Sequence, residues 1–470
     1  MTTLDTGRGG QTAARDGHDA AVEAETVALL QRLIAFRTVN PPGDELAAAR
    51  FVAGTLGAEG IPAEVIETAP GRGCVVGRLA GDGSARPVLL LAHLDVVDVE
   101  AESWTCDPFA GVVRDGYLYG RGAIDDKGML AANVMTMLLL KRRVIDAGGT
   151  LSRDVVLVAT ADEERGSAWG LGWLLEHRPE LLEADFALNE GGRIRCDDEG
   201  RPQYVAVQTA EKVPHQIDVV ARGPAGHASV PRSGNAVVRL GRALAAIGAH
   251  REPVRLTPST RAFFGRLAAA WPEPALAAAM AELTGSDDPE VTRGAMTVIG
   301  GDPALDAVLR NGISPVYVAG GRPANVIPAE ARASCDVRTL PGESIDGVAE
   351  RLRAAIDDPD VEITIAGRGE DAPPSPFESP MFSALADAAA GLMPGVPIVP
   401  YMSTGATDNA RLRRAGIPAY GLLPFPLAPE DERRMHGHDE RVPLASLHVG
   451  VRLVYGAVHR VAVANSTEQA

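Results

Sequence analysis

The 470-residue sequence has few aromatic residues and no excess of positive charge. Phe, Trp and Tyr make up 4% of the chain, so a core must consist mainly of the Ala, Val and Leu that bring the hydrophobic fraction to 46%. The formal net charge of −17 argues against nucleic acid as a partner, because phosphate binding needs a basic surface. The same charge disfavours an anionic membrane surface.

Other features that define particular protein classes are also missing. The four cysteines form no C-x-x-C pair, which argues against a disulfide scaffold or a structural zinc knot. The polar, Gly-rich start of the chain lacks the apolar segment of a secretory signal. The longest apolar stretch, residues 128–140, is too short to span a bilayer. We therefore expect a cytoplasmic protein with a disordered tail over residues 1–20.

Apolar strand patterns alternate with helix patterns in the first part of the chain. Residues 88–93, 154–160 and 184–190 read as buried strands, and residues 168–182 read as one of the intervening helices. This alternation predicts an α/β fold with a mostly parallel or mixed sheet flanked by helices.

The pattern changes near Glu211 to half-exposed strands and helices, which is typical of an α+β domain. A Pro-rich junction follows near residues 369–380, and helix and strand patterns then resume. We predict a discontinuous domain of residues 21–210 and 371–465, interrupted by an inserted α+β domain of residues 211–370.

Histidine and carboxylates follow the ends of the predicted strands. His93 and Asp95 close the first strand, Glu163 and Glu164 follow the second, and Glu190 follows the third. Because ligand sites in open α/β sheets lie at the carboxyl ends of the strands, we expect these side chains to meet at one edge. Nitrogen and oxygen ligands gathered in this way predict a metal site.

A Gly-rich turn adds further carboxylates at Asp125 and Asp126. The nearby cations are few, namely Arg121, Lys127 and Arg165, and divalent metal ions would supply the missing counter-charge. The ligand set is too large for one tetrahedral ion, and it fits two ions that share a bridging carboxylate.

Each of these residues also has a purely structural interpretation. His93 alone could be a core histidine with satisfied hydrogen bonds. Asp126 and Asp162 are suited to cap a helix or a turn. Arg338 could pair with a neighbouring carboxylate on the surface. It is the delivery of ligands by three successive strand ends that favours the metal site.

Seven segments, in order, carry a family resemblance: "HLDVV", "GRGAIDDKG", "TADEERG", "NEGG", "GHASVP", "NVIPAEA…DVRTLPG" and "HGHDE". The chain resembles the di-zinc metallopeptidase family of aminoacylase, glutamate carboxypeptidase, acetylornithine deacetylase and succinyl-diaminopimelate desuccinylase, over about residues 22–462. The resemblance implies a zinc-peptidase-like catalytic domain, an inserted lid or dimerisation domain, and a homodimer. It also implies two Zn²⁺ per chain, with Co²⁺ or Mn²⁺ as alternatives.

The resemblance further implies a role for each matched residue. Five residues would bind metal: His93, Asp125, Glu164, Glu190 and His436. Asp125 would bridge both ions, and its peptide bond to Asp126 is cis in relatives. Asp95 would hold the second ring nitrogen of His93. Glu163 would act as general base.

Another group of residues would contact the substrate: His227, Asn325, Arg338, Gly405 and Thr407. His227 would stabilise the oxyanion and Arg338 would hold a free carboxylate. In relatives the inserted domain forms the dimer contact, so His227 could act in its own subunit or in the partner's site. Two assignments stay open, because His438 rivals His436 and Asp162 stands beside Glu163 as an alternative base.

These expectations define a hydrolase of the carboxypeptidase, dipeptidase or aminoacylase type. It would cleave an amide bond in a small peptide or N-acyl amino acid with a free carboxylate, through a zinc-bridging water and a Glu general base. A non-catalytic metal-binding protein of the same fold and a di-metal phosphoesterase are the alternatives. The non-ligand acid beside a ligand, Glu163 beside Glu164, argues against the first alternative.

Overall fold

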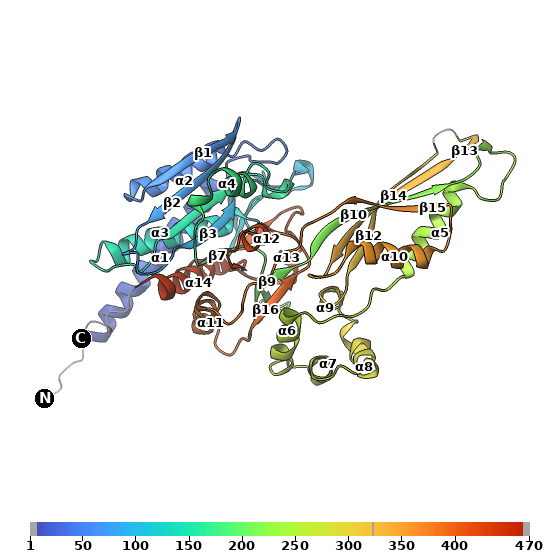
Figure 1. Ribbon diagram of the computed structural model, residues 1–470. Helices are drawn as coiled ribbons and strands as arrows, with labels where there is room; N and C mark the ends of the chain where they lie inside the picture. The colour runs from blue at the N-terminus through green and yellow to red at the C-terminus, as the bar shows by residue number, and fades with distance from the viewer. Residues whose placement is uncertain (1–6, 322–323, 464–470) are drawn as a thin grey trace. The chain divides into compact units, whose positions relative to one another are not determined.

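A computed structural model describes residues 7–321 and 324–463, and the chain divides into two units (Figure 1). The first unit comprises the chain up to Gln208, Ser375–Val399 and the chain from Thr407 onward. The second unit comprises Thr209–Pro374 and Pro400–Ala406.

The first unit is built on a mixed sheet with a parallel centre. The strand order is β1-β2-β6-β3-β7-β17-β9-β8-β18, with β16 beside β9. The strands are β1 Ala63–Ala69, β2 Arg72–Leu79, β3 Val88–His93, β6 Val155–Thr160, β7 Phe186–Asn189, β8 Arg193–Cys196, β9 Pro202–Glu211, β16 Ile398–Ser403, β17 Ala419–Gly421 and β18 Pro426–Leu427. A separate small sheet contains β4 Val112–Arg114, β5 Tyr117–Tyr119 and β19 Arg441–Pro443.

The central strands β3 and β6 are buried along their whole length, as expected for parallel strands covered on both faces. Strand β3 lies parallel to β6, with His93 opposite Thr160, and parallel to β7, with Leu90 opposite Leu188. The carboxyl ends of these three strands therefore lie at the same edge of the sheet.

Helices cover both faces of this sheet. Side chains of α1, α2, α3, α11 and α14 form one core with Leu90 and Leu157, whereas α4 and α12 form another with Leu91 and Val158. The helices are α1 Gly7–Ile34, α2 Leu46–Ala58, α3 Lys127–Leu140, α4 Leu171–His177, α11 Pro380–Leu392, α12 Asn409–Arg414, α13 Pro429–Glu432 and α14 Leu444–Ala462. The predicted fold class of a mixed sheet flanked by helices is confirmed.

Two local predictions differ from the structure. Helix α1 begins at Gly7, within the segment predicted to be a disordered tail, and residues 1–6 lie outside the described part of the chain. The helix predicted over 168–182 is shorter, because α4 ends at His177 and a 3-10 turn begins at Pro179, whose ring cannot continue an α-helix.

The second unit contains a four-stranded antiparallel sheet in the order β12-β14-β10-β15. Its strands are β10 Val213–Arg222, β12 Gly312–Gly320, β14 Glu330–Thr339 and β15 Val361–Gly367, with β11 Gly226–His227 and β13 Val326–Ile327 paired nearby. Its helices are α5 Ala236–Ala249, α6 Pro258–Ala268, α7 Pro274–Gly285, α8 Pro289–Ile299, α9 Pro303–Ala307 and α10 Ile345–Ile356. Helices α5 and α10 pack on the sheet, so β10 and β14 alternate between buried and less buried residues.

The second unit also includes residues 400–406, which the sequence placed with the catalytic domain. One reason is aromatic packing, since the ring of Tyr401 lies 5.8 Å from that of Phe263. Among the described residues, no helix combines the length and the apolarity needed to cross a bilayer.

Candidate metal centre

The strand ends of the first unit bring the predicted ligands together. His93 is the last residue of β3, and Glu163 and Glu164 lie in a 3-10 turn that follows β6. His93, Glu163 and Glu190 each offer a ligand atom within 4.8 Å of the others, and so do His93, Asp125 and Glu164. Two candidate metal clusters therefore meet at His93.

Asp125 lies between two histidines that are distant in sequence. Its Oδ1 is 2.9 Å from His93 Nε2 and its Oδ2 is 3.0 Å from His436 Nε2. Glu164 Oε1 lies 3.3 Å from the same His436 nitrogen. Each oxygen of one carboxylate thus faces a different histidine, as a bridging ligand requires. The cis peptide bond expected between Asp125 and Asp126 is confirmed.

The two histidines of "MHGHDE" have different surroundings. His438 Nε2 lies 3.5 Å from Glu100 Oε2, a residue outside the ligand set, so the geometry favours His436. The loop that carries His436 is anchored by buried Glu440, which accepts hydrogen bonds from Arg121 Nη1 at 2.7 Å and from the backbone N of Asp125 at 3.1 Å.

Asp95 holds the ring of His93 differently from the expectation. His93 Nδ1 lies 2.9 Å from the backbone oxygen of Asp95 and 3.5 Å from its carboxylate Oδ1. The carboxylate instead accepts hydrogen bonds from the backbone N of Glu163 at 3.1 Å and of Glu164 at 3.2 Å. The reason is that the amides at the start of this turn have no partner within the turn and compete for the carboxylate.

Asp126 and Asp162 occupy the N-cap positions of α3 and of the 3-10 turn Glu163–Arg165, but neither side chain makes a capping hydrogen bond there. Asp126 Oδ2 accepts from the backbone N of His93 at 3.3 Å. Asp162 Oδ1 accepts from Arg72 Nη2 at 3.0 Å, and the pair is buried. Because this carboxylate is already engaged, the geometry favours Glu163 over Asp162 as the base.

The carboxylates of Asp125 and Glu164 pair with two histidines, His93 and His436. Burial, together with neighbouring carboxylates, raises the pKa of Glu163 and of Glu190 well above the usual range. Burial also opposes ionisation of Asp125, yet hydrogen bonds from His436 and His93 hold the pKa of Asp125 below its usual range.

The cations that lie near in sequence are engaged elsewhere. Arg121 pairs with Glu440, and Arg165 is exposed. Lys127 Nζ donates to the backbone oxygen of Phe36 at 2.6 Å, and burial lowers its pKa to about 7. None of the three neutralises the carboxylate cluster.

A test of fit to metal ions rests on the donor atoms themselves. Buried Glu164 Oε1 makes no well-aligned hydrogen bond among the described residues, and its ion-pair neighbour is His436 Nε2 at 3.3 Å. A set of imidazole nitrogens and carboxylate oxygens is the donor chemistry that zinc and similar divalent ions take. The residues present therefore fit the binding of two divalent ions.

The predicted substrate residues of the second unit fall into two groups. His227 in β11 pairs with Val326 in β13, and the backbone N of Ala228 donates to the backbone oxygen of Asn325 at 2.9 Å. His227 and Asn325 are therefore neighbours. Arg338 lies near the end of β14 and donates through Nε to Asp336 at 2.9 Å, which is the kind of pair that a structural interpretation predicts.

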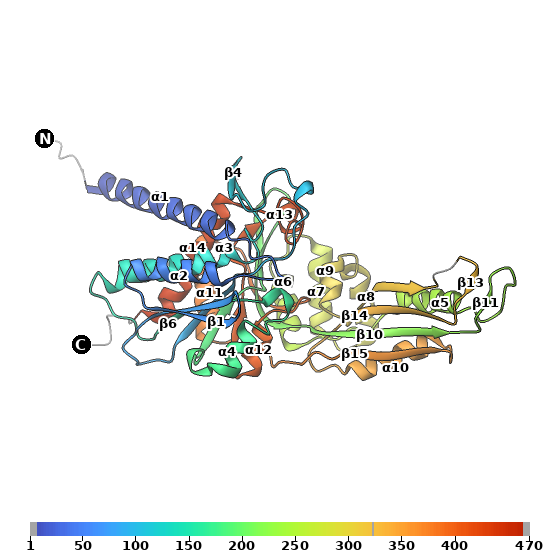
Figure 2. The same cartoon turned by 90° about the horizontal axis from the view of Figure 1, so that it is seen from above.

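The two groups lie at opposite ends of the second unit's sheet. Strands β11 and β13 lie beyond the end of β14 that starts at Glu330 (Figure 2). Arg338 stands eight residues further along β14, which corresponds to roughly 26 Å at about 3.3 Å per residue. His227 and Arg338 of one chain therefore cannot both touch one small substrate.

Gly405 and Thr407 lie in one loop, whose residues are assigned partly to the first unit and partly to the second. The backbone N of Gly405 donates to Ser403 Oγ at 3.2 Å, and Thr407 Oγ1 accepts from the backbone N of Asn409 at 3.2 Å. Gly405 belongs to the second unit and Thr407 to the first.

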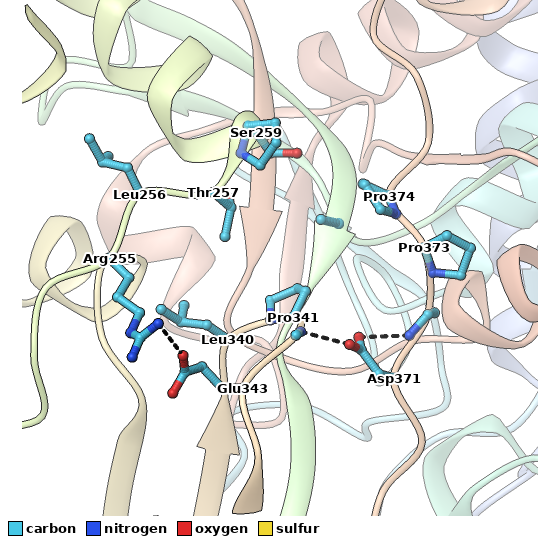
Figure 3. Close-up of a pocket in the computed structure, with 14 residues that line it drawn as sticks. Arg255, Leu256, Thr257, Ser259, Leu340, Pro341, Glu343, Asp371, Pro373 and Pro374 are labelled. Atoms are coloured by element: carbon cyan, nitrogen blue, oxygen red, sulfur yellow. Dashed lines mark hydrogen bonds and ion pairs between the residues drawn. The ribbon is translucent and has the colours of Figure 1, made fainter. Parts of the chain in front are cut away.

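The second unit also has a cavity of about 680 Å³, which Figure 3 shows. Its lining comes from residues 255–259, 340–343 and 371–374, with Ala210. Its charged groups have partners within the lining, since Arg255 Nη1 lies 2.8 Å from Glu343 Oε1 and Asp371 Oδ2 accepts from the backbone N of Gly342 at 2.7 Å. None of the predicted metal ligands lines this cavity.

The sequence reasoning missed three buried residues that support the site. Glu440 stands in the segment "HGHDE", so the signal was present but unused. Asn40 and Glu45 stand in the Pro-rich segment "VNPPGDE", for which no role was predicted. Polar residues in a Pro-rich turn beside a ligand-bearing strand are a signal that could have found them.

The fold and the site together define a metallohydrolase that has room for two metal ions. Residues 89–460 match the family described as Peptidase family M20/M25/M40, and the chain belongs to that family. It is 27% identical over 376 residues to N-fatty-acyl-amino acid synthase/hydrolase PM20D1 of Xenopus tropicalis, covering 79% of this chain and 72% of that protein. It is 27% identical over 437 residues to human aminoacylase-1, covering 91% and 93% of the two chains.

Solved structures share the fold at low sequence identity. Human carnosine dipeptidase 1 superposes with a TM-score of 0.68 at 15% identity, covering 95% of this chain and 97% of that one. The Bacillus subtilis YxeP protein, described as a dinuclear metal binding peptidase from the M20 family, has a TM-score of 0.58 at 16% identity, with coverage of 93% and 98%.

Proposed function

We propose that this protein is a metal-dependent hydrolase that cleaves an amide bond in a small peptide or N-acyl amino acid with a free carboxylate. The observation that carries the proposal is Asp125, whose two oxygens face His93 and His436 within a cluster of buried carboxylates. Family membership and the similarity to aminoacylase-1 support the reaction class. The similarity to PM20D1 supports an N-acyl amino acid as substrate.

The ions are proposed to be two Zn²⁺ per chain, with Co²⁺ or Mn²⁺ as alternatives. Five residues would hold them: His93, Asp125, Glu164, Glu190 and His436. When bound, such ions lower the pKa of a water molecule and polarise a substrate carbonyl.

Glu163 moves the proton in this proposal. Its carboxylate takes a proton from the attacking water and delivers it to the nitrogen of the leaving amine. Asp95 fixes the backbone of Glu163 and the ring of His93, so it orients both the base and a ligand.

Recognition of the substrate is proposed for residues that the family resemblance singles out. Arg338 would bind the free carboxylate through its planar fork. His227 would donate a hydrogen bond to the oxyanion. Asn325, Gly405 and Thr407 would complete the contacts with the substrate.

We also propose a homodimer formed through β12. Val316, Tyr317 and Val318 of this edge strand have exposed fractions of 66%, 60% and 63%. An exposed apolar edge is a template for pairing with another strand. Val237 and Val238 of α5 add exposed apolar surface. The separation of His227 from Arg338 supports a dimer in which His227 and Asn325 serve the partner's site.

Metal analysis combined with a substrate panel tests the main proposal. We expect about two zinc ions per chain, as in two-metal hydrolases, and turnover of N-acyl amino acids or dipeptides but not of p-nitrophenyl phosphate. Turnover of the phosphate ester alone would favour the phosphoesterase alternative. Bound metal without turnover of any substrate would favour the non-catalytic alternative. A cytoplasmic location stays a prediction.

A mixing experiment tests the role of His227 and the dimer together. His227→Ala and Glu163→Gln should each be inactive with metal retained. Heterodimers of the two variants should recover activity, because one of their two sites has both residues intact. Heterodimers without activity would place His227 in its own subunit's site. Val318→Lys should give monomers in size-exclusion chromatography, and an unchanged dimer would exclude β12 as the contact.

A further inference from the structure

A line of buried polar side chains leads from the Pro-rich turn of residues 40–45 to the metal centre. Asn40 Nδ2 donates to Asp95 Oδ2 at 2.8 Å and to Asp162 Oδ1 at 3.0 Å. Arg72 Nη2 donates to the same Asp162 oxygen at 3.0 Å. All four side chains are buried. One neutral amide thus joins two buried carboxylates, and one cation lies behind them.

Arg72 is enclosed by the turn. Its Nε and Nη2 each donate to a different oxygen of buried Glu45 at 2.7 Å, in the bidentate arrangement that suits a guanidinium. Gly43 has a φ of 101°, and a Cβ at that position would lie 2.3 Å from Arg72 Nε. Only glycine therefore fits against the guanidinium. Since a buried carboxylate without a partner is costly, the pairing of Arg72 with both Glu45 and Asp162 stabilises this arrangement.

The other end of this line is the turn that carries the base and a metal ligand. Asp95 accepts the backbone N–H groups of Glu163 and Glu164. Asp162 precedes them directly, and its backbone oxygen accepts from Ser167 N at 2.6 Å, which closes the turn. Whatever fixes Asp95 and Asp162 therefore fixes the main chain of Glu163 and Glu164.

We propose that Arg72 and Asn40 are positioning residues for the reaction. They act through Asp162 and Asp95 on the main chain of the base Glu163. The inference rests on the proposed function, because it takes the roles of Glu163 and Glu164 from there. Loss of Arg72 leaves Asp162 without its cation and frees the turn to shift. A small displacement of a catalytic group is enough to cost a large factor in rate.

Arg72→Ala is the central variant, and Arg78→Ala is its matched control. Arg78 lies on the same strand and pairs with Asp154 at 2.6 Å, away from the metal centre. We expect Arg72→Ala to lower kcat by about 10- to 100-fold with little change in KM, the range for lost support of metal ligands. Added guanidinium ion should restore part of kcat in Arg72→Ala and change nothing in Arg78→Ala.

Two measurements without turnover complete the test. Hydrogen exchange should become faster in the peptide that contains Glu163 and Glu164 in Arg72→Ala, and stay unchanged in Arg78→Ala. Zinc affinity of the metal-free protein, measured by competition with a chromophoric chelator, should fall by about tenfold or more. If Arg72→Ala does not fold, Arg72→Lys and Asn40→Ala replace it, with the same changes expected in smaller amount.

The outcomes separate the inference from the proposed function. A folded Arg72→Ala enzyme with unchanged kcat would overturn the inference. A loss of activity that is proportional to the fraction of unfolded protein, and that added guanidinium ion does not reverse, would also overturn it. A wild-type protein without amidase activity would refute the proposed function instead. In that case unchanged exchange and unchanged zinc affinity in the variant would also refute the positioning role, whereas faster exchange with weaker zinc binding would sustain it.

Discussion

Two buried glutamates, one in each unit, show opposite electrostatics. Glu252 in the second unit is 3% exposed and accepts hydrogen bonds from Arg351, His250 and Asn311. Burial opposes its ionisation, but these donors lower its pKa to about 2. Glu190 in the first unit is 7% exposed, and burial together with nearby carboxylates raises its pKa well above the usual range.

The two glutamates differ in which groups neutralise their buried charge. Where the charge has a structural role, the chain supplies its own cation and neutral donors. At the strand ends of the first unit it gathers carboxylates and directs the neighbouring cations elsewhere, as with Arg121 and Glu440. A buried carboxylate without a protein cation thus marks the place where a ligand supplies the charge.

Among the substitutions that test this difference between the two units, removal of the Asp125 carboxylate should have the largest effect. Asp125→Ala should lose both metal ions and all measurable activity, because Asp125 faces His93 and His436, each of which is proposed to bind a different ion. Metal content per chain after gel filtration measures this. Glu252→Gln is the control and should keep its metal. A fully loaded Asp125→Ala protein would mean that Asp125 does not bridge.

Replacing each of the two neighbouring glutamates by glutamine in turn should distinguish the general base from the metal ligand. Glu163→Gln should lower kcat by about 10²- to 10⁴-fold with metal retained, because an amide cannot accept the proton. Glu164→Gln should instead lose metal. The reverse pattern would exchange the two roles, and loss of metal in both would move the base elsewhere.

The two histidines of "MHGHDE" offer a matched pair of variants. His436→Ala should remove about one of the two ions, because it removes the imidazole proposed to bind that ion. His438→Ala should change neither metal content nor activity, since its neighbour is Glu100. Equal loss of metal in both variants would contradict the assignment of His436.

Arg338→Lys should have a smaller effect, confined to substrates with a free carboxylate. Loss of the bidentate fork should lower kcat/KM for those substrates by about tenfold or more, which corresponds to one lost charge-assisted hydrogen bond. Arg332→Lys is the control, because Arg332 lies on the same strand and pairs with Glu330. Equal turnover of free and amidated substrates by the wild type would remove this role from Arg338.

Glu252→Gln should change stability rather than chemistry. The ordinary pKa of this group is 4.5 and the folded value is about 2, so its stabilising effect is full above about pH 4.5. That effect is lost as the pH falls from 4.5 toward 2. At neutral pH the variant should lose about 1–3 kcal/mol, the cost of impaired buried hydrogen bonds. Thermal melts across this range should show the two proteins converging in acid. A difference in melting temperature that stays constant with pH would contradict the lowered pKa of Glu252.

The strand ends could be predicted from sequence because β3 and β6 are buried throughout and read as uninterrupted apolar runs. Parallel pairing then places their carboxyl ends together without further information. The support of the site could not be predicted in this way, because Arg72 and Asp162 are 90 residues apart and meet only through tertiary structure. Nor does the alternating pattern of β14 say which end of that strand carries a functional group.

The length of β14 has a consequence for enzyme assays. If Arg338 at one end of the sheet and His227 beyond the other have the roles proposed for them, a single chain would carry parts of two sites and complete neither. The active unit would then be the pair of chains, and the rate per milligram of protein would depend on dilution. Well below the dissociation constant of the dimer, the observed rate should rise with the square of protein concentration rather than in proportion to it.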